Sequence, residues 1–98
     1  MQDFTDFFWT SSEGLPLHAR DYAPKDVAGK LPVICIHGLT RNARDFEDLA
    51  PRIAATGRRV LAVDVRGRGL SACDPNPMNY HPGTYAADIV ALLQATGI

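Results

Sequence analysis

The sequence has few cysteines, no excess of charge of either sign and no long hydrophobic run. Its two cysteines, Cys35 and Cys73, are too few for a disulfide framework and favour a reducing compartment. Lys and Arg total 10 and Asp and Glu total 11, so no positive surface is expected to attract nucleic acid or an anionic membrane. The apolar runs, such as Val33–Ile36, are far shorter than the roughly 18 residues of a membrane-spanning helix. Because the N-terminus also lacks a basic segment, we expect a cytoplasmic protein without nucleic-acid or membrane partners.

The first pattern along the chain is that of a β-hairpin. Residues 7–9 are aromatic, and the turn-forming cluster of residues 11–14, Ser-Ser-Glu-Gly, follows them. In residues 15–20, Leu and Ala then alternate with Pro, His and Arg. This period of two predicts a second strand with one buried and one exposed face.

The pattern then changes to strands that alternate with helices. Val33–Ile36 and residues 60–63 are short apolar runs without alternation, which is typical of strands buried on both faces. Between them, apolar residues at helical spacing predict a helix that Asn42 caps, that kinks or restarts at Pro51, and that ends at Gly57.

A second helix is predicted over residues 83–96, with Gly97 as its C-terminal cap. The predicted order is therefore a hairpin followed by β-α-β-α. Strands that alternate with helices of this length indicate an α/β fold with a mostly parallel sheet and right-handed crossovers. The chain shows neither an internal repeat nor a domain boundary.

One motif stands where the first buried strand ends, at His37-Gly38. In open α/β sheets, ligands bind outside the carboxyl ends of the strands. Gly38 permits a sharp turn there, and the N–H groups that follow it could stabilise a developing oxyanion in a cleft. Taken alone, an ordinary β-α turn in which local backbone groups bond His37 is the simpler interpretation.

A second motif, Asp-x-Arg-Gly-x-Gly-x-Ser over residues 64–71, follows the second buried strand and is typical of a tight, non-helical loop. Its glycines superficially match a dinucleotide-binding G-x-G-x-x-A, but that motif must open a helix and Pro75 and Pro77 forbid one here. Its Arg-Gly pairs are too few for an RNA-binding repeat in a chain of near-neutral charge.

Three polar side chains are weak candidates for catalytic or metal-binding groups. Ser71 does not stand at a strand-turn-helix elbow, so a nucleophile assisted by His81 and Asp64 is not favoured. His18 and His81 have no Cys, Asp or Glu at metal-ligand spacing. We therefore expect no metal site and no cofactor.

Together, the two motifs at this spacing resemble the N-terminal part of the α/β-hydrolase fold superfamily. The hairpin matches the first two strands of that fold, and residues 85–93 match the helix before its nucleophile strand. The resemblance covers nearly the whole chain and says little about the subfamily. It is carried by His37, Gly38, Leu39, Asp64, Arg66, Gly67, Gly69 and Ser71.

The resemblance implies a role for several of these residues. In the superfamily, the amide after the His-Gly pair is an oxyanion-hole donor, which here is the N–H of Leu39, and His37 and Gly38 shape the turn. Arg66 and Ser71 are expected to be architectural. The superfamily nucleophile stands in G-x-S-x-G, with the acid and the histidine after it, and no serine of this chain lies in that motif.

Residues 1–98 are therefore expected to be the N-terminal segment of a single α/β-hydrolase domain, without its nucleophile elbow and later strands. The nucleophile, acid and histidine would come from the remainder of the domain, as a second chain or a missing segment. The strand Val33–Ile36 should lie beside residues 60–63, with its other edge bare. Because a bare apolar edge promotes aggregation, we expect residues 1–98 alone to be unstable as a monomer, and inactive.

The resemblance implies hydrolysis of a small-molecule substrate, with acyl transfer to water on an ester, lactone or amide as the default. An aspartate nucleophile would instead imply epoxide hydrolase or haloalkane dehalogenase chemistry. A non-enzymatic binding module on the same scaffold and an unrelated small α/β domain that binds a nucleotide are the remaining alternatives.

Overall fold

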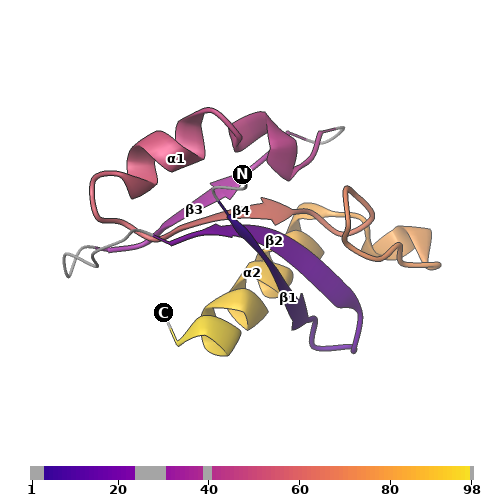
Figure 1. Cartoon of the computed structure of the whole chain (residues 1–98). Helices are drawn as coiled ribbons and strands as arrows, with labels where there is room; N and C mark the ends of the chain where they lie inside the picture. The colour runs from indigo at the N-terminus through magenta and orange to yellow at the C-terminus, as the bar shows by residue number, and fades with distance from the viewer. Residues whose placement is uncertain (1–3, 24–30, 39–40, 98) are drawn as a thin grey trace.

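Strands and helices alternate along the described part of the chain, which comprises residues 4–23, 31–38 and 41–97 of a computed structural model. The strands form a sheet in the order β1-β2-β4-β3 (Figure 1). The β3–β4 pair is parallel, whereas the β1–β2 and β2–β4 pairs are antiparallel, and the predicted α/β fold is confirmed. The elements are β1 (Thr5–Thr10), β2 (Pro16–Tyr22), β3 (Val33–Ile36), η1 (Ala43–Phe46), α1 (Leu49–Ala54), β4 (Val60–Asp64), η2 (Pro77–Asn79) and α2 (Pro82–Thr96).

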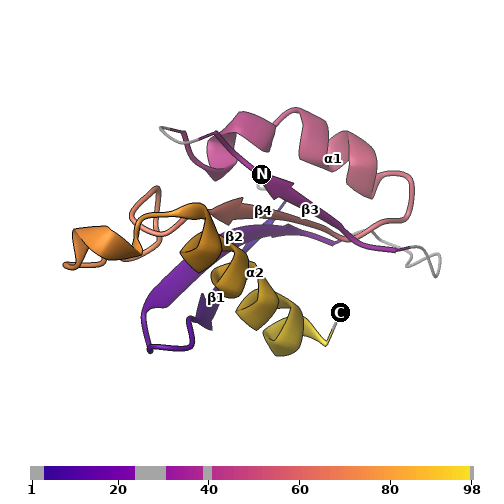
Figure 2. The same ribbon diagram turned by 180° about the vertical axis from the view of Figure 1, so that it is seen from behind.

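Helices cover both faces of this sheet. The η1 and α1 segments lie on one face and α2 lies on the other, as both views show (Figures 1 and 2). Successive side chains of a strand point to opposite faces, and β4 therefore supplies both cores. Val60 and Ala62 pack in the core beneath α1, whereas Leu61 and Val63 pack in the core that includes Leu92 of α2. No helix among the described residues is long and apolar enough to span a membrane.

The β2 strand is central in the sheet, and its burial differs from the prediction. Leu17 and Ala19 are buried as expected, but His18 between them is buried as well. The prediction of one exposed face is wrong because carboxylates from the neighbouring strands, Asp6 of β1 and Asp64 of β4, bond the His18 ring. Nothing local in the sequence signals partners that lie on other strands.

The β3 strand begins and ends where the sequence predicts, and it lies beside β4 as expected. The prediction that both faces of β3 are buried is wrong, because Ile36 is 54% exposed. Within the described residues β3 pairs with β4 only, so its other edge is open. Cys35 is buried in the core beneath α1, and this burial raises the pKa of its thiol.

The helical segment after β3 is divided in two. Asn42 caps η1 as predicted, and its side chain accepts a hydrogen bond from the Arg44 N–H at 2.9 Å. Proline has no N–H and its ring collides with the carbonyl four residues earlier, so an α-helix containing Pro51 must begin within the preceding turn. The α1 helix accordingly begins at Leu49, and Gly57 follows its end with a φ of 94°.

The α2 helix matches its prediction within one residue. It begins at Pro82, a residue whose fixed φ suits the first turn of a helix, and the His81 ring caps it by accepting from the Gly83 N–H. Gly97 ends it with a φ of 73°, in the left-handed region that favours glycine.

Candidate functional site

The candidate site lies at one edge of the sheet, where β3 and β4 end. Because the two strands are parallel neighbours, their carboxyl ends meet there. The turn at His37-Gly38 follows β3, and the loop of residues 65–71 follows β4. The structure therefore brings the two sequence motifs together. Leu39, the predicted oxyanion donor, lies outside the described residues.

His37 joins the turn to the start of the loop. The Val65 N–H donates to its Nε2 at 2.9 Å, and its Nδ1 lies 2.6 Å from the Gly38 carbonyl oxygen. A backbone N–H can only donate, so Nε2 carries no proton and Nδ1 carries the proton that it donates to Gly38. This neutral ring is almost fully buried. Both ring nitrogens of His37 therefore bond backbone groups.

The turn is also bracketed on its far side. The Arg41 N–H donates to the Gly38 carbonyl at 3.0 Å. Gly38 has no positive φ, and a Cβ built there would meet, among the described residues, only Arg41 Cγ at 3.9 Å. The described part of the chain therefore gives no steric reason for glycine at this position, and the sharp turn expected there stays a prediction.

Asp64 is the polar centre of the same sheet edge. Its Oδ1 accepts from the Ala43 N–H at 2.7 Å, and its Oδ2 accepts from the Leu70 N–H at 3.1 Å and contacts His18 Nδ1 at 2.6 Å. Burial alone would raise the pKa of Asp64, but the hydrogen bonds from His18, Ala43 and Leu70 outweigh it and lower that pKa. The carboxylate lies directly against Gly69, where a Cβ would collide with it.

Ser71 is engaged by the backbone. Its Oγ donates to the Asp64 carbonyl at 2.6 Å and accepts from the His18 N–H at 2.9 Å. The His81 ring instead bonds Gly83 and Thr84 at the start of α2. The geometry therefore gives Ser71 no base to activate it, in agreement with the architectural role that the resemblance implies.

Arg66 is buried among three carboxylates from three parts of the chain. Its guanidinium makes two hydrogen bonds to Asp88 of α2, at 2.7 and 3.1 Å, and contacts Glu13 and Asp74 at 2.8 Å each. The Arg66 guanidinium, together with the Ser12 hydroxyl, lowers the pKa of Glu13 to about 2. These contacts join the hairpin turn, the loop after β4 and α2, so Arg66 is an architectural residue here.

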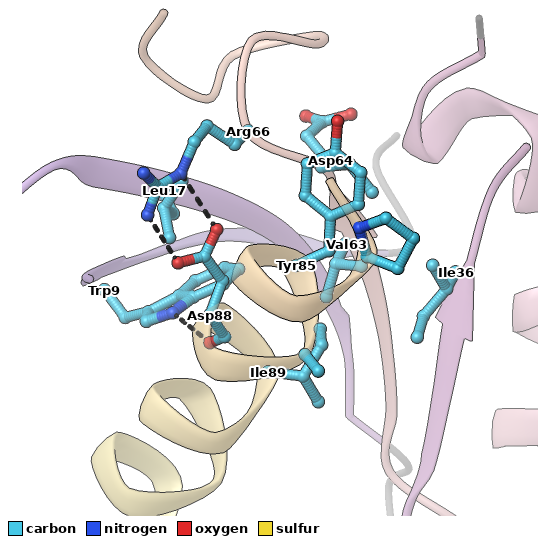
Figure 3. Close-up of a pocket in the computed structure, with 12 residues that line it drawn as sticks. Trp9, Leu17, Ile36, Val63, Asp64, Arg66, Tyr85, Asp88 and Ile89 are labelled. Atoms are coloured by element: carbon cyan, nitrogen blue, oxygen red, sulfur yellow. Dashed lines mark hydrogen bonds and ion pairs between the residues drawn. The ribbon is translucent and has the colours of Figure 1, made fainter. Parts of the chain in front are cut away.

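An apolar pocket of about 270 Å³ opens beside this arginine (Figure 3). It lies between the ends of β3 and β4 and the first turns of α2, and Ile36, Tyr85 and Ile89 are among its walls. The Trp9 indole N–H donates to the Asp88 carbonyl at 3.0 Å on its far side. Within the described ranges, no group of three or more His, Cys, Asp or Glu side chains is arranged to hold a metal ion.

Sequence reasoning missed the partners of two of these groups. The contact between His18 and Asp64 joins positions 46 residues apart, and the contact between Arg66 and Glu13 joins positions 53 apart. For Arg66, the sequence contained one signal, Asp88, which is an acidic residue among the apolar positions of the last helix. A buried carboxylate there needs a partner of opposite charge.

Comparisons with known proteins agree with this fold. Residues 32–98 match the family of the alpha/beta hydrolase fold. The chain also resembles an alpha/beta hydrolase of known structure from Novosphingobium aromaticivorans, with 50% identity and a TM-score of 0.92 over 100% of this chain and 33% of that one. The chain therefore belongs to the α/β-hydrolase fold family.

Two curated relatives carry different chemistry in their names. A non-heme chloroperoxidase of Streptomyces lividans is 36% identical over 86 residues, which are 88% of this chain and 29% of the relative. Epoxide hydrolase B of Mycobacterium tuberculosis is 31% identical over 84 residues, which are 86% of this chain and 23% of the relative. The chain thus spans less than a third of the length of these relatives.

Proposed function

We propose that the protein is an acyl hydrolase that acts on a small-molecule ester, lactone or amide. In this proposal residues 1–98 supply one backbone donor of the oxyanion hole. The nucleophile, the histidine and the acid come from the remainder of the domain, as a second chain or a further segment. The observation that carries the proposal is the turn after β3, in which the His37 ring bonds the backbone on both sides of the site.

An oxyanion donor stabilises the transition state only if it is oriented before the reaction starts. The Gly38 carbonyl accepts from both His37 Nδ1 and the Arg41 N–H, so the backbone is bonded on both sides of position 39. Val65 fixes the other ring nitrogen of His37. We assign the donor to the Leu39 N–H because it follows the His-Gly pair at the carboxyl end of a sheet strand.

The proposal also places the remainder of the domain on one surface of this chain. Ile36 belongs to β3, whose outer edge is open, and its side chain is exposed. The same side chain lines the apolar pocket together with Tyr85 and Ile89. An open strand edge can pair with another strand, and exposed apolar surface favours burial, so proteins usually cover or pair such a surface. In our proposal the later strands of the hydrolase domain cover this surface, and the intact protein means residues 1–98 together with those strands.

A second candidate reaction is the opening of an epoxide or the removal of a halide by an aspartate nucleophile. The similarity to Epoxide hydrolase B favours it. The two candidates differ in what an oxyanion hole would stabilise during attack on the substrate. A carbonyl substrate develops negative charge on its own carbonyl oxygen, whereas an epoxide or a haloalkane has no carbonyl group at the attacked carbon.

The decisive experiment replaces Leu39 in the intact protein. Leu39→Pro deletes the backbone N–H, and we expect kcat on a nitrophenyl ester to fall about 10²–10³-fold, with a smaller change in KM. Leu39→Ala retains the N–H and is the matched control, for which we expect nearly unchanged kcat. Circular dichroism verifies that both variants are folded.

A folded Leu39→Pro protein with wild-type kcat would remove Leu39 from the oxyanion hole. An intact wild-type protein that opens a styrene oxide substrate but hydrolyses no nitrophenyl ester would replace the acyl proposal by the epoxide one.

A further inference from the structure

The His18 ring is buried with a carboxylate at each of its two nitrogens. Nδ1 lies 2.6 Å from Asp64 Oδ2, and Nε2 lies 2.8 Å from Asp6 Oδ1. The side chain of His18 is 2% exposed and that of Asp64 is 4% exposed, whereas that of Asp6 is 45% exposed. The Phe8 ring lies beside the His18 ring, with 5.0 Å between the two centroids.

These two contacts determine the charge of the ring. An ionised carboxylate can only accept hydrogen bonds, and a neutral imidazole has a single N–H to donate. The backbone N–H groups of Ala43 and Leu70 also donate to Asp64, and together with His18 they lower its pKa and favour its ionised form. Both contacts are therefore satisfied only by an imidazolium with a proton on each nitrogen.

Asp6, His18 and Asp64 line a second, polar pocket, which two cationic side chains also face. Arg20 of β2 and Arg44 of η1 line it together with Asp6, His18 and Asp64. The loop after β4 contributes only uncharged residues to it, Gly69 and Leu70.

Burial, like the positive charge of the arginines, disfavours an imidazolium. The hydrogen bonds from the ring to Asp64 and Asp6 outweigh burial and raise the pKa of His18. One arginine is also partly neutralised, since Arg20 Nη1 lies 3.7 Å from Glu47.

We propose that His18 is a positioning residue, which as an imidazolium fixes the Asp64 carboxylate and, through it, the Ala43 and Leu70 amides on either side of the candidate site. Ala43 begins η1, directly after the turn at Gly38, and Leu70 lies in the loop after β4. The link to catalysis rests on the proposed function, because it assumes that this turn carries the oxyanion donor. The link from His18 to the two amides rests on the contacts alone.

The charge of His18 makes this arrangement sensitive to pH in one direction. The pKa of the folded state is above the ordinary 6.5, so the stabilisation is fully present below about 6.5 and is lost as the pH rises through the raised value. The proton that leaves is the one facing Asp6, because Asp6 can turn into water and the buried Asp64 cannot. The ring then contacts Asp64 without its positive charge.

Nuclear magnetic resonance of the intact protein labelled with ¹⁵N tests this assignment. The ring nitrogens of His18, identified by their absence in His18→Gln, should both be protonated at neutral pH. The amide signals of Ala43 and Leu70 should shift with the same midpoint as the ring when the pH is raised. Asp6→Asn removes one negative charge at an exposed position and should lower that midpoint by roughly one pH unit.

Glu13→Gln is the matched control. Like Asp6, Glu13 is an exposed acidic residue of the hairpin, and it pairs with a buried cation, Arg66. We expect it to leave the titration of His18 unchanged. In kinetics, the alkaline decline of kcat on a nitrophenyl ester should move to lower pH in Asp6→Asn and not in Glu13→Gln. A decrease of stability without a change at His18 would not produce this difference.

A His18 ring with one proton at neutral pH would overturn the proposal, and so would Ala43 and Leu70 amides that do not follow the ring. An alkaline limb of kcat that is the same in wild type and Asp6→Asn would also overturn it. If the ring and the amides behave as expected but the wild type hydrolyses no ester, the positioning of the amides stands and the proposed function fails.

Discussion

The turn after β3 and the loop after β4 leave the same edge of the sheet, yet they are stabilised in different ways. The loop contains a buried arginine bonded to three carboxylates, a buried serine bonded to the backbone, and two glycines with positive φ, Gly67 and Gly69. The described part of the turn has one neutral histidine, His37, and a glycine with an ordinary φ.

The turn also depends on groups that belong to the end of β4 and its loop. His37 accepts its hydrogen bond from Val65, and Ala43, just after the turn, donates to Asp64. The segment that we propose to be catalytic is therefore oriented by the segment that is architectural. We therefore expect substitutions in the loop to alter the turn as well, whereas the effect of substitutions in the turn should be confined to the turn.

The largest effect is expected at Arg66. Arg66→Met retains most of the side-chain volume but leaves Asp88 buried without its cation, so we expect a loss of roughly 3–5 kcal/mol in the free energy of unfolding. Urea denaturation of the intact protein followed by circular dichroism measures it. Glu13→Gln leaves the contact of Arg66 with Asp88 intact and should destabilise much less. Equal losses in the two variants would show that the hairpin contact, and not the contact with α2, stabilises the loop.

A smaller effect separates the two glycines, one in each segment. Gly69→Ala places a Cβ against the Asp64 carboxylate at a positive φ, which should destabilise the protein by about 2–4 kcal/mol. Gly38→Ala meets only an ordinary contact and should leave stability unchanged or raise it by up to ~1 kcal/mol. The midpoint of thermal unfolding measures both variants. A Gly38→Ala variant that is as unstable as Gly69→Ala would break the comparison, since the turn would then be as constrained as the loop.

The smallest effect is expected at Asn42, whose side chain caps the η1 segment that leaves the turn. Asn42→Ala removes that hydrogen bond and should lower the free energy of unfolding by about 0.5–1 kcal/mol. Asn42→Asp retains an acceptor at the same place and is the control. Because the effect is confined to the turn, hydrogen exchange at Arg44 should accelerate while exchange at the amides of the loop after β4 stays the same.

Local signals in the sequence were enough to predict most of the fold. The apolar run of β3, the asparagine that caps η1 and the glycine that ends α2 each act through neighbouring residues, and the structure reproduces them. Pro51 also predicts that the helix after β3 is interrupted, and the structure shows an interruption. It lies before the proline, because the proline ring constrains the preceding turn.

The polar contacts of the site could not be predicted in the same way. The alternation in β2 predicts an exposed His18, whereas its partners Asp6 and Asp64 bury it. These partners lie on other strands, and local periodicity does not reveal which strands pair. His37 and Gly38 were identified because a short motif carries them. Even there, the interaction of His37 with Val65 depends on the parallel pairing of β3 and β4.

Trp9 connects the beginning of the described chain to its last helix, and this has a consequence for the order of folding. Its indole bonds the Asp88 carbonyl, 79 positions away, and β2 beside it pairs with β4 rather than β3. During synthesis the hairpin therefore emerges from the ribosome long before its partners, and contacts between distant positions form slowly. The β3-α1-β4 unit can assemble first from neighbouring segments. Because Trp9 is buried in the core that includes Leu92 of α2, its fluorescence should change when α2 docks, which gives this late step a signal without any added label.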